Sequence, residues 1–205
     1  RDIIQNLEKY TKDPQEVSCI GFCASKAHAE FMADKFNKVG LRSKYLTSDN
    51  SNRRTDVLDK FKNKEINYLF VVDMFNEGVD IPQIDTVLFL RPTESLTIFL
   101  QQLGRGLRLH ESKDVLTVLD FVGQAKEEYD FENKFRALIG KTTTTVAHEI
   151  ERDFPKLPLG CSIVLEKKAK EYILENIRKA TKLDKRQLIK KIQQFKNHTN
   201  NPLTL

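Results

Sequence analysis

Residues 17–40 have the sequence VSCIGFCASKAHAEFMADKFNKVG, and this stretch decides the expected fold. It opens with an apolar run without strict polar alternation, which is typical of a parallel strand covered on both faces. Ser25 then stands where a helix N-cap belongs, and Gly40 stands where the chain must turn out of the helix. Between them, apolar residues recur on one face at helical spacing: Ala29, Met32, Ala33, Phe36 and Val39.

The same alternation of strand and helix continues through the first 140 residues. Further apolar runs occupy 68–72, 86–90 and 115–122, with a weaker run at 42–46. Helical patterns lie between the runs, at 52–62 (with Val57, Leu58 and Phe61) and at 94–103. Strands that alternate with helices require right-handed crossovers, so we predict an α/β fold with a doubly wound parallel sheet. Ligands of such sheets bind at the carboxyl ends of the strands.

The character of the chain changes after Gly140. The polar run KTTTT at 141–145 predicts a linker, and helical patterns follow at 165–180 and 184–196. The first of these helices has one apolar face, made of Tyr172, Ile173, Ile177 and Ala180. We therefore expect two domains, residues 1–140 and residues 141–205, and the second is predicted to be a truncated helical appendage.

The composition limits the function classes. Of 205 residues, 40% are apolar and 31% charged, which is typical of a globular chain and not of a disordered one. No apolar stretch approaches the roughly 20 residues of a membrane span. Three cysteines without paired spacing favour a reducing compartment, which predicts a cytoplasmic protein. No metal site is predicted either, because Cys19 and Cys23 have no further ligands nearby in the sequence. The net charge of +5 permits a nucleic-acid partner without requiring one. The missing initiator Met predicts that the chain is part of a longer one.

The segment QQLGRGLR at 101–108 carries the first candidate site. As a helix it would place Gln101, Arg105 and Arg108 on one face, because they are spaced i, i+4 and i+7. Two guanidinium groups beside a glycine backbone suit a phosphate group. The alternative is a basic helix face that pairs with surface carboxylates.

The segment VVDMFNEGVDIPQIDTVLFLRP at 71–92 carries the second. Glu77, Gly78 and Asp80 follow a predicted strand, so they fall at the ligand edge of the sheet. A glycine lets the backbone approach a sugar or a phosphate, and an aspartate can accept hydrogen bonds from a ribose hydroxyl or orient an arginine. The alternative is a tight turn capped by Asp80.

In their order along the chain, 71–92 and then 101–108, the two segments resemble motifs V and VI of superfamily 2 helicases and translocases. The motif Q-x-x-G-R-x-x-R is matched at every fixed position by 101–108, and G-x-D-I-P is matched by 78–82. Residues 19–40 look like motif IV, and Arg54 begins the usual Arg-x-x-x-Leu-x-x-Phe helix. The sequence from Asn76 to Leu109 most resembles that of bacterial DEAD/DEAH-type helicases that also carry a phospholipase-D-like nuclease domain.

This resemblance implies a RecA-like second motor lobe. In such enzymes ATP sits between two lobes, and the first lobe holds the phosphates and Mg²⁺ through a P-loop and an Asp-Glu box. The second lobe supplies arginine fingers, here Arg108 with Arg105, while Gln101 would help place the phosphate or the attacking water. Gly78 and Asp80, with Glu77, would face the nucleotide.

Nucleic acid is the partner that the resemblance implies, with DNA expected rather than RNA, and no membrane. The candidate contacts follow predicted strands: Ser25, Lys26, Asp73 and Asn76. For Ser25 the alternative is plain N-capping. The basic stretch 165–196 could add phosphate contacts, or it could be a solvated face. Many family members have a Thr where this chain has Val72, so one nucleic-acid contact is in question.

Gly140-Lys141-Thr142 has the form of a P-loop ending, but the preceding residues lack the required first glycine and show a helical pattern. Without a P-loop or an Asp-Glu box, this chain alone is expected not to hydrolyse ATP. Two alternatives stay open. One is a non-hydrolysing nucleic-acid-binding or scaffold module, and the other is the motor subunit of a restriction or defence complex.

Overall fold

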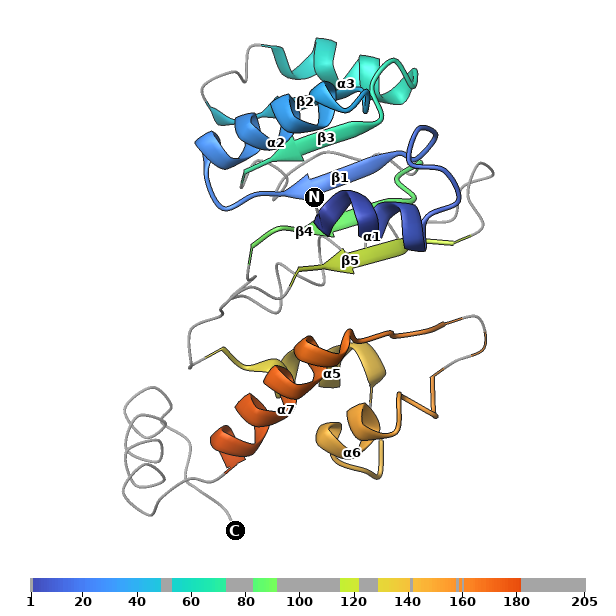
Figure 1. Ribbon diagram of the computed structural model, residues 1–205, viewed down its shortest axis with the longest axis vertical. Coiled ribbons are helices and arrows are strands. Elements are labelled where there is room, and N and C mark those ends of the chain that lie inside the picture. The colour runs from blue at the N-terminus through green and yellow to red at the C-terminus, as the bar shows by residue number, and fades with distance from the viewer. Residues whose placement is uncertain are drawn as a thin grey trace, which may run out of the picture. The chain divides into compact units, whose positions relative to one another are not determined.

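The computed structural model describes residues 2–48, 53–72, 83–91, 115–121, 129–140, 142–157, 159 and 161–181. The chain divides into two compact units, Arg1–Ala125 and Lys126–Leu205 (Figure 1). No helix within the described ranges combines the length and the apolar character that crossing a membrane requires.

The described part of the first unit contains a parallel sheet. Its strands are β1 (Cys19–Phe22), β2 (Ser43–Leu46), β3 (Tyr68–Val71), β4 (Thr86–Phe89) and β5 (Thr117–Asp120). They lie in the order β2-β3-β1-β4-β5, and every neighbouring pair is parallel. Each strand coincides with one of the five apolar runs, so the predicted α/β fold with a doubly wound parallel sheet is confirmed. The weakest run also forms a strand because β2 pairs with the fully buried β3.

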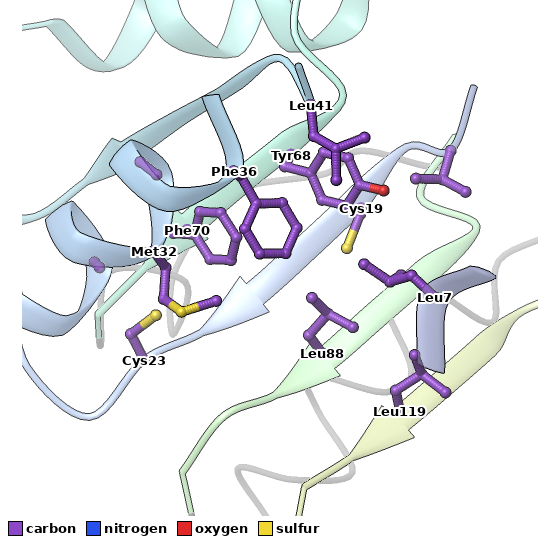
Figure 2. Packing of buried hydrophobic residues seen from close by; sticks show 13 residues of the cluster. Leu7, Cys19, Cys23, Met32, Phe36, Leu41, Tyr68, Phe70, Leu88 and Leu119 are labelled. Atoms are coloured by element: carbon purple, nitrogen blue, oxygen red, sulfur yellow. The ribbon is translucent and has the colours of Figure 1, made fainter. Parts of the chain in front are cut away.

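One face of the sheet packs against α1 (Asp2–Tyr10) and α2 (Lys26–Lys38). Because the strands pair in register, Gly21, Phe70 and Leu88 lie side by side and face the same way. Phe36 of α2 sits at the centre of this core, with its ring centroid 4.9 Å from those of Tyr68 and Phe70 (Figure 2). Leu7 of α1 is buried in the same cluster.

The other face of the sheet is also apolar and buried. Phe22 and Phe89 stack there with ring centroids 5.4 Å apart, beside the buried Ile20 and Val87. Helix α3 (Arg54–Lys62) contacts β2 and buries Val57 and Phe61, two of its three predicted core residues. Leu58, the third, is half-buried. The predicted helix at 94–103 lies outside the described residues.

Helix α2 ends one residue earlier than predicted. Val39 is its C-cap, with φ −103, and its side chain is 54% exposed. The prediction that Val39 lies on the buried face is therefore wrong, because the chain has already left helical geometry there. The predicted turn at Gly40 is confirmed by its φ of +84.

Gly21 tests how tightly the α2 face of the sheet is packed. A Cβ at this position would lie 2.6 Å from Cδ1 and 2.8 Å from Cε1 of Phe70, and Phe36 packs against that ring. We expect Gly21→Ala to lower the free energy of unfolding by about 1–3 kcal/mol, the usual cost of overpacking, as measured by chemical denaturation. The penalty should shrink in a Phe70→Leu background, whereas an unchanged penalty would contradict this cause.

The described part of the second unit contains α5 (Phe131–Ile139), α6 (Val146–Glu151) and α7 (Lys167–Thr181). Helix α5 packs against both α6 and α7, so it joins the second unit. The division at Ala125 consequently falls before the predicted boundary at 140. Ring contacts fill this small core: Phe131 with Tyr172 at 5.8 Å, and Phe135 with Phe154 at 5.7 Å between centroids.

Helix α7 confirms the helix predicted at 165–180. Ile173 and Ile177 are buried, and Tyr172 is half-buried, as its predicted face requires. Ala180 is exposed, so its placement on that face is wrong: one turn beyond Ile177, the helix has passed the core that it covers. The helix predicted at 184–196 lies outside the described residues.

Candidate functional site

The candidate site lies at the carboxyl edge of the sheet. The last residues of β1, β3 and β4 (Phe22, Val71 and Phe89) are in register, so the loops that follow these strands leave from one edge. This is the edge at which doubly wound sheets bind ligands. The segment that starts at Ala24 and the segment that starts at Asp73 both follow such strand ends.

Most predicted site residues lie outside the described residues. These are Gln101, Arg105, Arg108, Asp73, Asn76, Glu77, Gly78 and Asp80. Their roles stay predictions. Ser25 and Lys26 are described, and both stand at the sheet edge where α2 begins.

Ser25 is the N-cap of α2. Its backbone is extended (φ −155, ψ 165), and its Oγ accepts a hydrogen bond from the His28 N–H at 3.2 Å. The N-capping interpretation is therefore confirmed. It leaves the Ser25 hydroxyl proton available to a ligand, because a hydroxyl can accept and donate at the same time. Lys26, the first residue of the helix, is exposed.

His28 closes the same turn from the other side. The backbone N–H of Ala24 donates to His28 Nδ1 at 3.3 Å. Partial burial lowers the pKa of His28, which favours the neutral ring that this acceptor role needs. The sequence analysis assigned no role to this histidine. The signal was its place three residues after the N-cap, where capping boxes carry Glu or Gln.

Cys23 and Arg91 lie just beyond the ends of β1 and β4. Burial raises the pKa of the Cys23 thiol to about 12, and the positive charge of Arg91 opposes that rise only in part. Burial also raises the pKa of Cys19. Both cysteines are therefore protonated core side chains. Sequence reasoning missed Arg91, although a cation directly after a buried strand was a usable signal.

The described ranges contain no group of three or more His, Cys, Asp and Glu side chains that could hold a metal ion. The opposite, amino edge of the sheet is held by structural hydrogen bonds. Ser18 N–H donates to both carboxylate oxygens of Asp85 at 3.1 Å, and Tyr68 Oη donates to the Pro14 carbonyl at 2.7 Å. Arg42, exposed and directly before β2, also stands at this amino edge, away from the candidate site.

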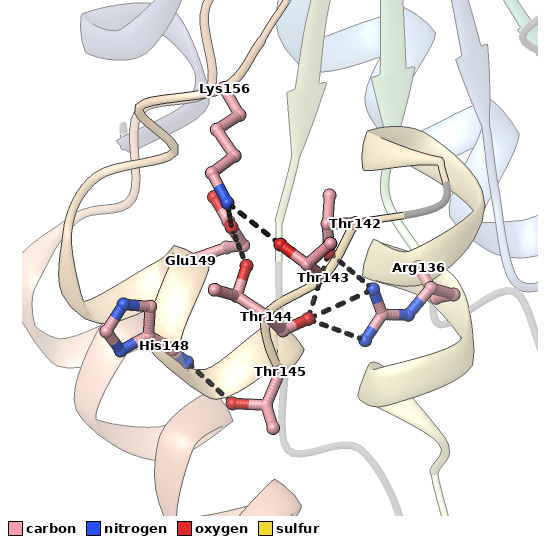
Figure 3. Close-up of polar contacts among 8 residues, drawn as sticks. All are labelled: Arg136, Thr142, Thr143, Thr144, Thr145, His148, Glu149 and Lys156. Carbon is pink, nitrogen blue, oxygen red and sulfur yellow. Dashed lines mark hydrogen bonds and ion pairs between the residues drawn. The ribbon is translucent and has the colours of Figure 1, made fainter.

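Gly140 and Thr142 do not have the setting of P-loop residues. Gly140 ends helix α5 with φ +73, whereas a P-loop glycine precedes its helix. The Thr142 hydroxyl accepts from Arg136 Nη1 at 2.8 Å and donates to the Thr144 carbonyl at 2.9 Å, so it is already committed (Figure 3). The Walker-type interpretation is excluded, in agreement with the sequence argument.

The segment predicted as a linker is a bonded part of the second unit. Arg136 also donates to the Thr144 carbonyl, and the Thr144 hydroxyl donates to the carboxylate of Glu149. Glu149 is buried, and Lys156 Nζ lies 3.8 Å from its Oε1 (Figure 3). Buried carboxylates need such partners, and here Thr144 and Lys156 supply them.

Several cations of α7 are paired with carboxylates. Lys170 lies 2.5 Å from Asp153, Arg178 lies 2.8 Å from Glu151, and Lys179 lies 2.8 Å from Glu175. These pairs favour the solvated-face interpretation of the helix over the phosphate-contact interpretation.

The chain matches the family described as "Helicase conserved C-terminal domain" over residues 2–110, just over half of its length. It is 40% identical over 121 residues to "Putative ATP-dependent helicase IRC3" of Saccharomyces cerevisiae, covering 57% of this chain and 18% of that protein. It is 32% identical over 124 residues to "UvrABC system protein B" of Chlorobium limicola, covering 56% of this chain and 17% of that protein. The chain thus spans less than a fifth of the length of these relatives.

Among solved structures, the chain is similar to one described as "Mss116p DEAD-box helicase domain 2 bound to an RNA duplex". The TM-score is 0.52 at 19% identity, over 86% of this chain and 62% of the other. At that identity the likeness shows the fold alone, and the fold is the RecA-like parallel sheet expected from the sequence.

Proposed function

Because the chain belongs to the family of helicase conserved C-terminal domains, we propose that it is the second motor lobe of an ATP-dependent nucleic-acid helicase or translocase. The match at 2–110 carries this proposal, since it includes β1 to β4 of the described parallel sheet and both segments with motif spacing, 71–92 and 101–108. The name of the yeast relative, an ATP-dependent helicase, supports the same activity.

In the proposed arrangement, a first lobe outside this chain binds ATP and Mg²⁺, which supply the phosphoanhydride bond and its charge neutralisation. Arg108 and Arg105 reach the terminal phosphate, and Gln101 orients the phosphate or the attacking water. Gly78 and Asp80, with Glu77, approach the nucleotide from the loop after β3. The described part of the sheet supports the placement of this loop at the ligand edge, because β3 ends at Val71, directly before the loop.

The nucleic-acid backbone is proposed to cross the same edge. Ser25 offers a hydroxyl, Lys26 is an exposed cationic residue, and Asp73 and Asn76 belong to the segment that follows β3 in the sequence. Helix N-termini favour phosphate groups, which suits the start of α2. The resemblance favours DNA over RNA as the track, and the link to a phospholipase-D-like module stays a prediction. Val72, where many family members have Thr, offers no hydroxyl to the backbone.

The test is ATP hydrolysis by the full-length protein with duplex DNA, single-stranded DNA and RNA in parallel. We expect hydrolysis to rise severalfold with one class of nucleic acid, which identifies the track. The 205-residue chain alone is expected to hydrolyse no ATP, because it contains no P-loop. Binding of nucleic acid without turnover in the full-length protein would contradict the motor proposal and favour a non-hydrolysing binding module. Turnover only with a partner subunit would point instead to a restriction or defence complex.

A further inference from the structure

The turn between β1 and α2 is fixed by three successive groups. Cys23 N–H donates to the Val71 carbonyl at 2.9 Å, which continues the pairing of β1 with β3. Ala24 N–H donates to the His28 ring at 3.3 Å, and Ser25 Oγ accepts from the His28 backbone at 3.2 Å. His28 therefore contacts the turn through both its ring and its backbone, and it holds the residues that precede Lys26.

The ring contact does not follow from the capping sequence alone. Thr145 and His148 repeat the pattern at the start of α6, where Thr145 Oγ1 accepts from the His148 N–H at 3.3 Å. Figure 3 shows this backbone contact, and the His148 ring makes no hydrogen bond within the described part of the chain. The ring of His28 thus serves a contact specific to the sheet edge, and His148 is a matched control for it.

The charge of the group that accepts the Ala24 N–H affects how this edge can meet a phosphate group. Capping boxes normally carry Glu or Gln at the third helical position. A glutamate there would place a negative charge beside Ser25 and Lys26, where an incoming phosphate would be repelled. A neutral imidazole supplies the acceptor without that charge, and the partial burial of His28 favours the neutral form.

We propose that His28 is a positioning residue for nucleic-acid binding, whose ring holds the Cys23–Ser25 backbone so that Ser25 and Lys26 meet a phosphate group. This inference rests on the proposed function. A loop held in its binding conformation loses less entropy when the ligand arrives, so affinity rises without a new contact. His28 itself does not touch the phosphate.

The test compares His28→Gln, His28→Glu and His28→Leu in the full-length protein, with His148→Leu as the control. Gln keeps a neutral acceptor, Glu keeps the acceptor but adds a charge, and Leu removes the acceptor. The dissociation constant for a labelled single-stranded oligonucleotide, DNA and RNA in parallel, is measured by fluorescence anisotropy. Turnover at saturating nucleic acid and the thermal midpoint are measured on the same samples.

We expect His28→Gln and His148→Leu to bind within twofold of the wild type. His28→Glu and His28→Leu should weaken binding about threefold to tenfold, the range expected from one hydrogen bond or one nearby charge. Turnover at saturation should stay within twofold, and His28→Glu should keep the wild-type thermal midpoint. The effect of His28→Glu should fade at high salt.

Wild-type affinity in a folded His28→Leu would overturn the inference, because that variant lacks the acceptor. Wild-type affinity in His28→Glu would overturn it as well, even if His28→Leu does not fold, because it would show that no phosphate group lies near Ser25 and Lys26. Weakened binding by His28→Gln equal to that of His28→Leu would overturn it as well. Wild-type protein that binds the oligonucleotide but hydrolyses no ATP would contradict the motor proposal while the affinities still decide the role of His28. Absence of any binding by the wild type would overturn both.

Discussion

Replacing Arg108 by alanine in the full-length protein is expected to lower the nucleic-acid-stimulated rate of ATP hydrolysis by about 10³- to 10⁵-fold, the effect of an arginine finger in other nucleotide hydrolases. The reason is electrostatic. Charge develops on the terminal phosphate in the transition state, and a guanidinium group held beside it stabilises that charge more than it stabilises bound ATP. ATP binding should therefore persist. Hydrolysis is measured at saturating ATP and nucleic acid, and binding is measured with a fluorescent ATP analogue.

The matched control is Arg42→Ala. Arg42 is exposed directly before β2, at the amino edge of the sheet, and the candidate site lies at the carboxyl edge. Removal of this arginine should leave the rate within twofold of the wild type. Hydrolysis near the wild-type rate in Arg108→Ala would refute the proposed role of Arg108. Equal losses in both variants would show that a general loss of positive charge is responsible.

The largest stability effect is expected from Phe36→Ala. Phe36 is 2% exposed, and its ring contacts both Tyr68 and Phe70 edge-on at 4.9 Å between centroids (Figure 2). Truncation leaves a cavity between α2 and β3 in addition to the lost burial. We expect the free energy of unfolding to fall by about 3–5 kcal/mol, as measured by urea denaturation of the first unit's transition.

Phe31→Ala on the same helix is the control. Phe31 is 54% exposed, and the ammonium group of Lys35 lies 5.2 Å from its ring centroid. Such a surface change should alter the free energy of unfolding by about 0.5 kcal/mol or less. If Phe36→Ala cost no more than Phe31→Ala, α2 would not be packed on the sheet as described.

The elements with strong local signals were predictable. All five strands coincide with apolar runs, and the signal is strongest for β1, β3 and β4, because strands buried on both faces tolerate few polar side chains. The start of α2 at Ser25 and its end before Gly40 follow from side-chain capping and from the freedom of glycine at positive φ. Each strand and each helix end thus depends on residues that lie close together in the sequence.

The candidate site was only partly predictable. Their place after a predicted strand indicated Ser25 and Lys26, and the structure places both at the sheet edge. It did not indicate the His28 ring contact, because the same pattern at Thr145 and His148 produces no such bond among the described residues. The roles of Arg105, Arg108 and their neighbours follow from the resemblance and await the experiments above.

By itself, the sequence determined the five strands, the helices α2, α3 and α7, the parallel sheet and the capping of α2, since these depend on local pattern and on burial of apolar runs. Only the tertiary structure decided which residues lie just past a core, as at Val39 and Ala180. It also decided that α5 joins the second unit and that the threonine run bonds to Arg136 and Glu149. The physical reason is that the environment of a polar residue, or of a residue at a helix end, depends on the groups that it contacts. Packing between helices and strands determines those contacts, and the neighbouring residues in the sequence do not.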